Sequence, residues 1–288
     1  MNDKYTTVNY VVGFAVHERR FFFNTTKERK MIMKEKEYYD QIKDWNFDYF
    51  QIESESLTNF EMFDYLKSIT NEESKILDLG TGGGEKVLTE FPSNVKEILA
   101  TDYSKEMIKT AKKNLKLSGK KNIKFKIMDN LKMDVEKNYF DVVVARNTVT
   151  DPKQIYDCLK NHGYLLIHGV DMFDCHELKR IFGRGQAVND KRPISIRDYE
   201  NVLDAGFKDV ELIPIHEREY FKNRKLLKEF LLKVPIIDDF SEENGGVFGY
   251  YKKDLEDDKL DLYIKRNTFK EGIRLLRRYY VIVAKKEE

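Results

Sequence analysis

The sequence predicts an α/β fold in which a doubly wound, mostly parallel sheet is covered by helices on both faces. From residue 75 to about residue 170, short apolar runs of strand type alternate with helical stretches. Parallel neighbouring strands need long crossover connections, and helices are the usual ones. The chain has 288 residues, enough for one large domain of this class with an appendage.

The predicted elements follow one another in a regular order. Strands are predicted at 75–80, 95–102, 123–129, 140–147, 163–170, 208–215 and 278–286. Helices are predicted at 34–45, 58–68, 85–91, 104–118, 152–160 and 195–207, with helical pieces at 223–233 and 254–276. Thr58 and Glu61 fit a capping box at the start of the second helix. We therefore expect seven strands, N-terminal helices and a helical insertion before the last strand.

This pattern divides the chain into five segments. They are an extension (1–32), an N-terminal helical segment or lid (33–74), a ligand-binding core (75–215), a helical insertion that forms a cover (216–277) and the last strand (278–288). The extension joins a strand-like run to an aromatic triplet and a basic tail, and it lacks a helical period. Because methionines at 31 and 33 directly precede a good domain start, we expect the extension to be dispensable.

The composition is that of a globular protein with balanced charge. Hydrophobic residues make up 41% and charged residues 35% of the chain. Lys and Arg number 51 against 50 Asp and Glu, so no strong overall field attracts nucleic acid or an anionic membrane. Two cysteines, Cys158 and Cys175, fit a reducing compartment, and the longest apolar runs are too short to span a bilayer. The sequence predicts a cytoplasmic protein without a membrane partner.

The stretch SKILDLGTGGGEKVLTEF (74–91) places a glycine loop between a strand and a helix. Such a loop at the carboxyl end of a parallel strand is a site for a small ligand, which approaches the backbone more closely where no Cβ is present. The spacing is Asp78-x-Gly80-x-Gly82-x-Gly84, whereas a dinucleotide fingerprint would have its third glycine at Glu85. The alternative is a tight turn that only allows close helix–strand packing.

Two acidic residues strengthen the prediction of a nucleoside-type ligand. Asp102 ends the second strand, 22 residues after Gly80, where a carboxylate can accept hydrogen bonds from both hydroxyls of a ribose. Asp129 ends the third strand. A competing interpretation of Asp102 is a helix cap, a role that Ser104 could share.

From about 75 to 215, and again in the last strand, the chain resembles the class I S-adenosylmethionine-dependent methyltransferases. The motifs that carry this resemblance are ILDLGTGGGE, ATDYSKEMIKTAKKNL, IMDNLKMDVEKNYFDVVVARNTV and LKNHGYLLI. In the last of these, Asn161-His162 replaces the usual Pro-Gly. DLGTGGGE, the Arg-Asn pair at 146–147 and FLLKVPIIDDFS also resemble a poorly characterised bacterial methyltransferase subgroup. The resemblance implies a Rossmann-like sheet whose last strand is antiparallel, and S-adenosylmethionine as cofactor.

The resemblance also implies a set of cofactor-binding residues. They are Asp78, Gly80, Thr81, Gly82, Gly84, Asp102, Tyr103, Met107, Asp129, Asn130 and Arg146. The loop amides would face the methionine carboxylate and the ribose, and Asp78 would order the loop or approach the amino group. Asp102 would hold the ribose diol. Tyr103 and Met107 would flank the face of the adenine. Asp129, with Asn130 beside it, would hydrogen-bond the adenine amino group. Met107 has core packing as its alternative.

Methyl transfer from a sulfonium mainly requires alignment of the acceptor with the S–CH₃ bond. A nitrogen or sulfur acceptor can react without a dedicated base, whereas a hydroxyl or carbon acid usually needs one. The resemblance places Arg146 and Asn147 near the sulfonium methyl, and Asn147, His168 and Asp171 are the weak catalytic candidates. His176 is a further possible base. Asp171, Asp174, Cys175 and His176 match no metal motif, so no metal is expected.

Three segments outside the sheet could form the acceptor pocket. Residues 44–54 supply Trp45, Phe47, Tyr49 and Phe50, whose alternative is ordinary core packing. Residues 178–198 hold six Lys or Arg against two Asp and could form a lid, an anion-binding patch or a solvated loop. The insertion 216–277 would cover the acceptor. The lysines between 105 and 126 are expected on an exposed helix face.

The function predicted from the sequence is S-adenosylmethionine-dependent methyl transfer to a small-molecule acceptor. One alternative is methylation of an RNA base, which only the basic segment 178–198 supports. Another is a non-catalytic, S-adenosylmethionine-binding regulatory protein. A nicotinamide dehydrogenase is disfavoured by the spacing of the glycines.

Overall fold

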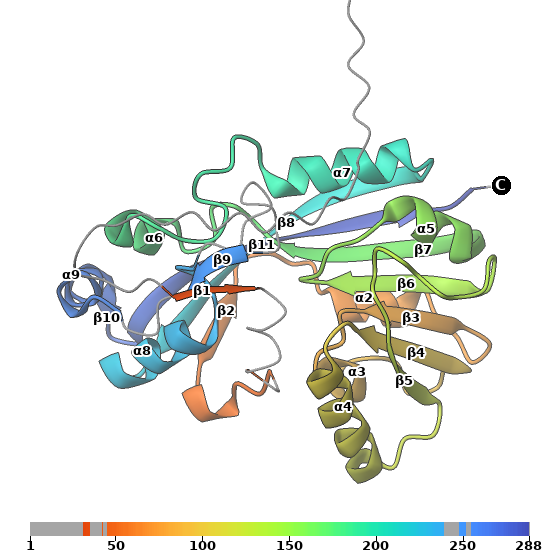
Figure 1. Cartoon of the computed structure of the whole chain (residues 1–288), viewed down its shortest axis with the longest axis horizontal. Helices are drawn as coiled ribbons and strands as arrows, with labels where there is room; N and C mark the ends of the chain where they lie inside the picture. Colours follow the sequence, from red (N-terminus) through yellow and green to blue (C-terminus); the bar gives the residue numbers. More distant parts are fainter. Residues whose placement is uncertain (1–30, 35–41, 43–44, 239–247, 252–254, 288) are drawn as a thin grey trace, which may run out of the picture.

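A computed structural model describes residues 31–34, 42, 45–238, 248–251 and 255–287 of the chain. Within these ranges the main sheet has nine strands, in the order β2-β8-β11-β7-β6-β3-β4-β5, with β10 paired to β11. Helices cover both faces of this sheet (Figure 1). The strands are β2 (Glu53–Ser56), β3 (Lys75–Leu79), β4 (Glu97–Asp102), β5 (Ile123–Ile127), β6 (Phe140–Arg146), β7 (Leu159–Val170), β8 (Lys208–Phe221), β10 (Thr268–Phe269) and β11 (Gly272–Lys285).

The predicted fold class is confirmed. Strands β5, β4, β3, β6 and β7 are parallel to one another, and β11 is antiparallel to both β7 and β8. All seven predicted strands are present. The sheet gains two more, β2 and β10, which are short and were not expected from the sequence.

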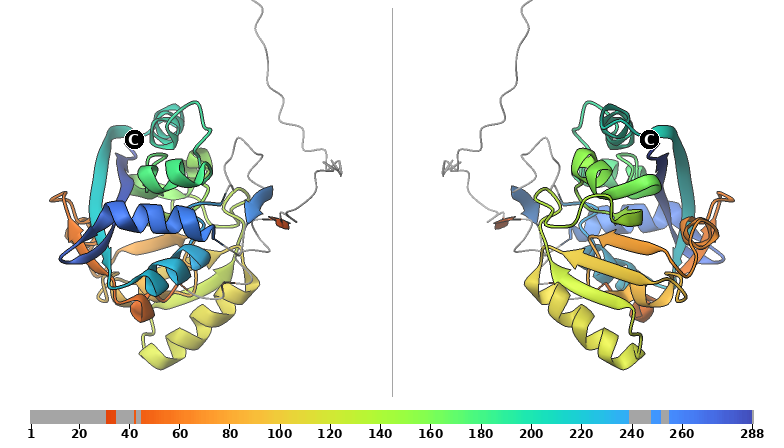
Figure 2. Two further views of the ribbon diagram at one scale, coloured as in Figure 1. Left: turned by 90° about the vertical axis from the view of Figure 1, so that its left-hand side faces the viewer. Right: turned by 90° about the vertical axis from the view of Figure 1, so that its right-hand side faces the viewer.

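Two apolar clusters bury the two faces of the sheet. Helices α2 (Met62–Ser68), α3 (Glu85–Thr89) and α4 (Lys105–Ser118) pack on one face, and α5 (Pro152–Cys158) and α7 (Ile194–Asp204) on the other. Figure 2 shows α4 and α7 on opposite sides of the sheet. The strands between them are buried on both faces, which explains their nearly continuous apolar sequences.

Strands β8 and β11 continue well beyond the rest of the sheet and support a second lobe. Their outer parts pair with each other from His216 to Phe221, and β2 pairs with β8 over part of that length. A third apolar cluster there joins these strands to α6 (His176–Phe182), α8 (Arg224–Lys233) and α9 (Asp257–Asn267). We call this lobe the cap; it comprises α6, α8, α9 and the outer parts of β8 and β11 (Figure 1).

Several predicted elements have different bounds or do not form. The predicted helical piece 254–276 is wrong beyond Asn267, because the chain there enters β10 and β11. The capping box is also wrong: Glu61 is the N-cap of α2 without a side-chain cap bond, and the Thr58 hydroxyl donates to the carbonyl of Pro214 (3.2 Å). The basic segment 178–198 begins inside α6. A helix there was not predicted.

Part of the N-terminal prediction cannot be compared with the structure. The extension up to residue 30 and most of the predicted helix 34–45 lie outside the described residues. Strand β1 (Met31–Lys34) pairs antiparallel with β9 (Phe248–Tyr251) as a separate two-stranded sheet. Among the described residues, every helix is too short or too polar to cross a membrane.

Candidate cofactor and acceptor site

The glycine loop lies at the carboxyl ends of β3 and β4. The backbone N–H groups of Gly80 and Thr81 both donate to the carbonyl of Thr101 (2.9 and 2.8 Å), so the loop bends over the end of β4. Gly80, Gly82 and Gly84 have φ values of 76°, 60° and 80°. Side chains are rarely tolerated in this left-handed region, so the backbone alone favours glycine at all three positions.

Close packing adds a second reason for the glycines. A Cβ at Gly80 would lie 2.7 Å from Cβ of Thr148, and one at Gly82 would lie 2.8 Å from Cδ1 of Trp45. A Cβ at Gly84 would lie 2.7 Å from Cζ of Phe125. The alternative interpretation, a tight turn that allows close helix–strand packing, therefore accounts for Gly84. Gly80 and Gly82 instead contact Thr148 and Trp45, which border the loop.

Asp102 links the end of β4 to the glycine loop. Its Oδ2 accepts a hydrogen bond from the backbone N–H of Gly82 (2.8 Å), and its Oδ1 accepts one from the backbone N–H of Ser104 (2.8 Å). The N-cap of α4 is Ser104, whose hydroxyl accepts from the backbone N–H of Met107 (3.3 Å). The N-cap of α4 is therefore Ser104 and not Asp102.

Several buried polar atoms at the loop have no hydrogen-bond partner within the described part of the chain. They are the carboxylate oxygens of Asp78, Oγ1 of Thr81, Oδ1 of Asn130 and Nε of Arg146. Arg146 approaches Asp78 at 3.6 Å, and burial raises the pKa of the Asp78 carboxyl despite that guanidinium. Buried polar groups are normally hydrogen-bonded, so unpaired ones at a glycine loop fit a site that a polar ligand completes.

The predicted adenine-side residues lie at the carboxyl ends of β4 and β5. Oδ1 of Asp129 accepts from the backbone N–H of Leu131 (2.9 Å), and the Asn130 amide donates to Oγ1 of Thr148 (2.9 Å). Tyr103 is 51% exposed. Met107 is 1% exposed, which favours its alternative as a core residue.

Asn147 and His168 are brought together at the ends of β6 and β7. Asn147 has a left-handed backbone (φ 50°), and its N–H donates to the carbonyl of His168 (2.8 Å). Its side-chain Oδ1 lies 3.2 Å from Nδ1 of His168. The imidazole packs on Tyr279 with 5.0 Å between ring centroids. Burial, and then the charge of Arg146, lowers the pKa of His168 to about 4, so the imidazole is neutral near pH 7.

The other predicted bases lie elsewhere. Asp171 accepts from the backbone N–H of Phe173 (2.8 Å) and from the hydroxyl of Ser195 on α7 (3.4 Å). His168 pairs with Val281, which belongs to the apolar cluster under α2–α4. Asp171 instead contacts α7, which packs on the other face of the sheet, so the two side chains are not grouped together. His176 is exposed at the start of α6. Within the described residues, no three His, Cys, Asp or Glu side chains are grouped as metal ligands would be.

An ion cluster between the sheet and the cap was missed by the sequence analysis. The guanidinium of Arg277 is buried and contacts Asp174 (Nε–Oδ1, 3.0 Å) and Glu219 (Nη1–Oε2, 3.1 Å). Arg277 lies two residues from both Leu275 and Tyr279 on β11, so the three side chains share one face of the strand, which is the inward face. The sequence could have indicated this burial through the two-residue spacing of Leu275, Arg277 and Tyr279. The neighbouring charged residues of β11 obscure that pattern.

The aromatic segment 45–50 connects the glycine loop to the cap. Trp45 lies against Gly82, and its backbone N–H donates to Oε1 of Glu85 (3.1 Å). Phe47 and Phe50 pack on Phe230 of α8, with centroid distances of 5.8 and 5.5 Å. Tyr49, by contrast, is 58% exposed. Trp45 thus borders the site. Phe47 and Phe50 pack in the cap, which agrees with the alternative of ordinary core packing.

The basic residues of 178–198 do not form one exposed patch. The ammonium group of Lys179 is buried and donates to the carbonyls of Met172 and Gln186 (3.3 and 2.8 Å). Arg184 pairs with Asp238 (3.3 Å) and Glu256 (3.4 Å) in the cap. These cations hold the cap together, which removes most of the support for an anion-binding patch in this segment.

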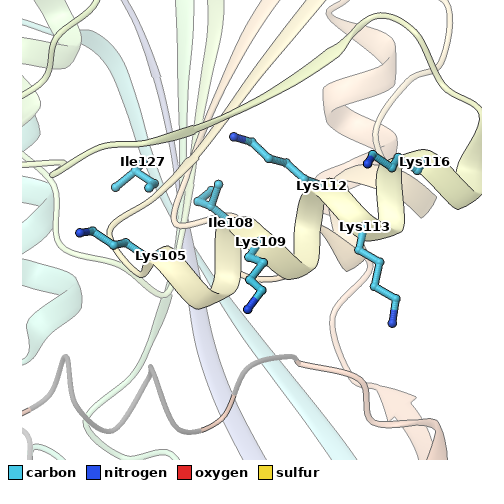
Figure 3. A pocket seen from close by; sticks show the side chains of 7 residues that line it. All are labelled: Lys105, Ile108, Lys109, Lys112, Lys113, Lys116 and Ile127. Atoms are coloured by element: carbon cyan, nitrogen blue, oxygen red, sulfur yellow. The ribbon is translucent and has the colours of Figure 1, made fainter.

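A cationic surface occurs instead along α4. Five lysines and two isoleucines line a shallow hollow there (Figure 3): Lys105, Ile108, Lys109, Lys112, Lys113, Lys116 and Ile127. This hollow contains no residue of the glycine loop, and the lysines lie on an exposed helix face as expected. It is therefore separate from the candidate site.

Comparison with known proteins agrees with this geometry. A family model described as a methyltransferase domain matches residues 70–195. A search of curated proteins gave no match. Among solved structures, protein BH2331 of Bacillus halodurans C-125 is 17% identical, with 78% of this chain and 99% of that chain covered and a TM-score of 0.53.

Two further solved structures are similar at a lower level. YcgJ of Bacillus subtilis is 16% identical over 79% of this chain and 97% of that one, with a TM-score of 0.48. A SAM-dependent methyltransferase from Aquifex aeolicus is 20% identical over 54% and 83%, with a TM-score of 0.40. The likeness to BH2331 shows the fold, and the family match covers the segment that holds the glycine loop, Asp102 and His168. The match of residues 70–195 to a methyltransferase domain supports a class I S-adenosylmethionine-dependent methyltransferase with S-adenosylmethionine as its cofactor.

Proposed function

We propose that the protein transfers a methyl group from S-adenosylmethionine to a small-molecule acceptor bound between the glycine loop and the cap. The observation that carries this proposal is the set of buried polar atoms of Asp78, Thr81 and Asn130 beside the loop that lack a hydrogen-bond partner among the described residues. When bound, the cofactor supplies an activated methyl group on a sulfonium. The residues of this chain bind it, orient it and exclude water.

The cofactor-binding roles follow from the contacts around the loop. Asp102 accepts a hydrogen bond from the Gly82 amide and would also accept the ribose hydroxyls. Asn130 is fixed through its amide to Thr148, which leaves its carbonyl oxygen for the adenine amino group. Asp78 and Thr81 would receive the polar end of the methionine. For Asp78, Thr81 and Asn130, these roles would satisfy buried polar atoms that have no hydrogen-bond partner among the described residues.

A small acceptor is favoured over RNA because the approach to the loop is bordered by packed segments. Trp45 lies on Gly82, and the neighbouring aromatic residues anchor it to α8. The cations that sequence reasoning offered to RNA, such as Lys179 and Arg184, are used inside the cap. Positioning the acceptor in line with the methyl group can lower the barrier by about 7–11 kcal/mol.

The proposal is tested by incubating the full chain with methyl-labelled S-adenosylmethionine and fractionated cell extract. Label in a low-molecular-mass product supports it, and label in RNA would favour base methylation. Cofactor binding without transfer to any fraction would favour the non-catalytic regulatory alternative. Asp102→Ala serves as the control, because its weaker cofactor affinity should lower labelling tenfold to 100-fold at limiting cofactor.

A further inference from the structure

Positive charge is concentrated on α4 and on the strand that follows it. Between residues 105 and 127 the chain has nine lysines and one acidic residue, Glu106, whereas the formal net charge of the whole chain is only +1. The rest of the chain is therefore net acidic. The balanced total charge, which predicts no attraction to an anionic membrane, thus conceals one strongly cationic region.

A straight row of four lysines runs along α4: Lys105, Lys109, Lys112 and Lys116. Their spacing of four, three and four residues follows the helical turn of about 3.6 residues, so they share one face over a length of about 16 Å. Lys113 lies beside the row, and all five side chains are exposed and line the shallow hollow of Figure 3. The opposite face of α4 packs on the sheet. We call these five residues the lysine face of α4.

The charge of the lysine face is largely unneutralised. In the described part of the chain, four of its five ammonium groups form no ion pair with a carboxylate. The exception is Lys109, whose Nζ lies 3.4 Å from Oε2 of Glu106. Like charges four residues apart destabilise a helix, and a solvated helix face usually avoids this repulsion by mixing both signs. The arrangement therefore favours a face that an anionic partner neutralises.

The composition of this region distinguishes among anionic partners. Residues 105–127 contain no arginine, and their one aromatic residue, Phe125, is buried. Arginine and exposed aromatic rings are the groups that bind phosphates in a bidentate manner and stack on the bases of RNA. They also dominate protein interfaces, where lysine is depleted. Lysine acts as a hydrated point charge, which suits a diffuse anionic surface better than RNA or a partner protein.

Two exposed apolar side chains accompany the lysines. Leu117, in the last turn of α4, is 80% exposed, and Ile127 on β5 is 47% exposed and lines the hollow. Strand β5 is the edge of the sheet at the end opposite β2 (Figure 1). The interface of a bilayer accommodates both kinds of group, because ammonium groups lie among the headgroups while apolar side chains enter the boundary of the acyl chains.

We propose that the lysine face of α4 docks reversibly on an anionic lipid bilayer. The inference goes beyond the proposed function and does not depend on it. The ammonium groups lie against the phosphates and carboxylates of the headgroups, and Leu117 and Ile127 enter the interface beside them. Each lysine close to an anionic bilayer contributes a roughly fivefold gain in affinity, so the face as a whole supports a measurable but salt-sensitive association.

The test is flotation of the full chain with lipid vesicles, without cofactor or acceptor. We expect binding to vesicles of phosphatidylcholine and phosphatidylserine in equal parts, none to phosphatidylcholine alone, and weaker binding as the salt concentration rises. Glutamine at all four positions of the row should lower the affinity at least 100-fold, whereas arginine at the same positions should retain it. The charge-matched control carries glutamine at four exposed lysines of other elements and should lose less than tenfold: Lys153, Lys225, Lys265 and Lys270.

Three results with vesicles would overturn the inference: equal binding to both kinds of vesicle, no binding to the anionic ones, or equal losses in the two glutamine variants. RNA is the competing partner. Tighter binding to single-stranded RNA than to the anionic vesicles, lost in the row variant, would assign the lysine face to RNA instead. Thermal unfolding checks the fold of the row variant, whose Tm should not fall, because the substitutions remove like-charge repulsion.

Discussion

Oδ2 of Asp102 accepts a hydrogen bond from the backbone N–H of Gly82 at 2.8 Å, so the acid that ends β4 is bonded to the glycine loop that follows β3. This bond joins two motifs that are 20 residues apart in the sequence. It fixes the loop next to the carboxylate that ends β4. The hydrogen bond therefore brings together the two motifs that the sequence analysis assigned to a nucleoside site.

Asp102→Ala should weaken cofactor affinity between tenfold and 100-fold. The substitution removes a charged hydrogen-bond acceptor from the ribose and frees the Gly82 amide, a loss of about 1.5–3 kcal/mol. Calorimetric titration with S-adenosylhomocysteine measures it. Asp102→Asn should lose less, because its amide oxygen still accepts.

Ser104→Ala separates binding from helix capping. Loss of this N-cap should destabilise the fold by about 1 kcal/mol with little change in cofactor affinity. If Ser104→Ala weakened the affinity as much as Asp102→Ala does, the assigned role of Asp102 would be wrong.

Gly80→Ala should destabilise the protein by more than the strain of its backbone. An alanine at φ 76° costs about 1–2 kcal/mol, and its Cβ would also meet Thr148 at 2.7 Å. Gly119→Ala is the matched control, because it has φ 69° and nothing within 4 Å of its Cβ. Urea unfolding of both variants measures the difference. Equal losses would show that the contact with Thr148 is unimportant.

The core of the fold could be predicted because its signals are local. The strand KILDL, the glycine loop and the strand that ends at Asp102 each carry their pattern within a few residues. Ser104, Asp151 and Asn223 likewise cap helices with their own side chains. In these segments the local propensity and the tertiary packing agree.

The cap and the ion cluster could not be predicted because they depend on contacts distant in sequence. Arg277 and Glu219 are charged residues of a type that is usually exposed. Both are buried here, because the guanidinium on β11 pairs with the carboxylate on the neighbouring strand β8. Thr58 was predicted to cap the helix that follows it, but its hydroxyl donates to the carbonyl of Pro214 instead. The pairing of Asn147 with His168 likewise appears only when β6 and β7 are aligned.

Arg277→Met should destabilise the fold by about 3–5 kcal/mol. The buried carboxylates of Asp174 and Glu219 would lose their common guanidinium, and uncompensated buried charge is costly. Chemical denaturation measures the loss. Adding Asp174→Asn and Glu219→Gln to the variant should restore part of the stability.

Arg224→Ala is the control for this effect. Its guanidinium also contacts two carboxylates, those of Asp257 and Asp261 (both 2.7 Å), but all three groups are exposed. An exposed pair contributes less than about 1 kcal/mol. If Arg277→Met cost no more than Arg224→Ala, the buried cluster would not be a stabilising link.

Acid should destabilise the wild type partly through His168. The pKa of His168 is about 4 when folded, against an ordinary value of 6.5, so the unfolded chain binds a proton that the folded chain does not. Stability from this group is present above pH 6.5 and is lost as the pH falls toward 4, by about 2–3 kcal/mol. His168→Gln should remove this part of the slope in urea unfolding between pH 7.5 and 4.5. Parallel profiles for the two proteins would contradict the shifted pKa.

The most direct measurement is a crystal structure of the full chain with S-adenosylhomocysteine. We predict the ribose hydroxyls on the carboxylate of Asp102 and the adenine amino group beside Asp129 and Asn130. The sulfur should face the side of the loop that leads to Asn147 and His168. A nucleoside bound elsewhere, or an Asp102 carboxylate that contacts no ribose oxygen, would contradict the account.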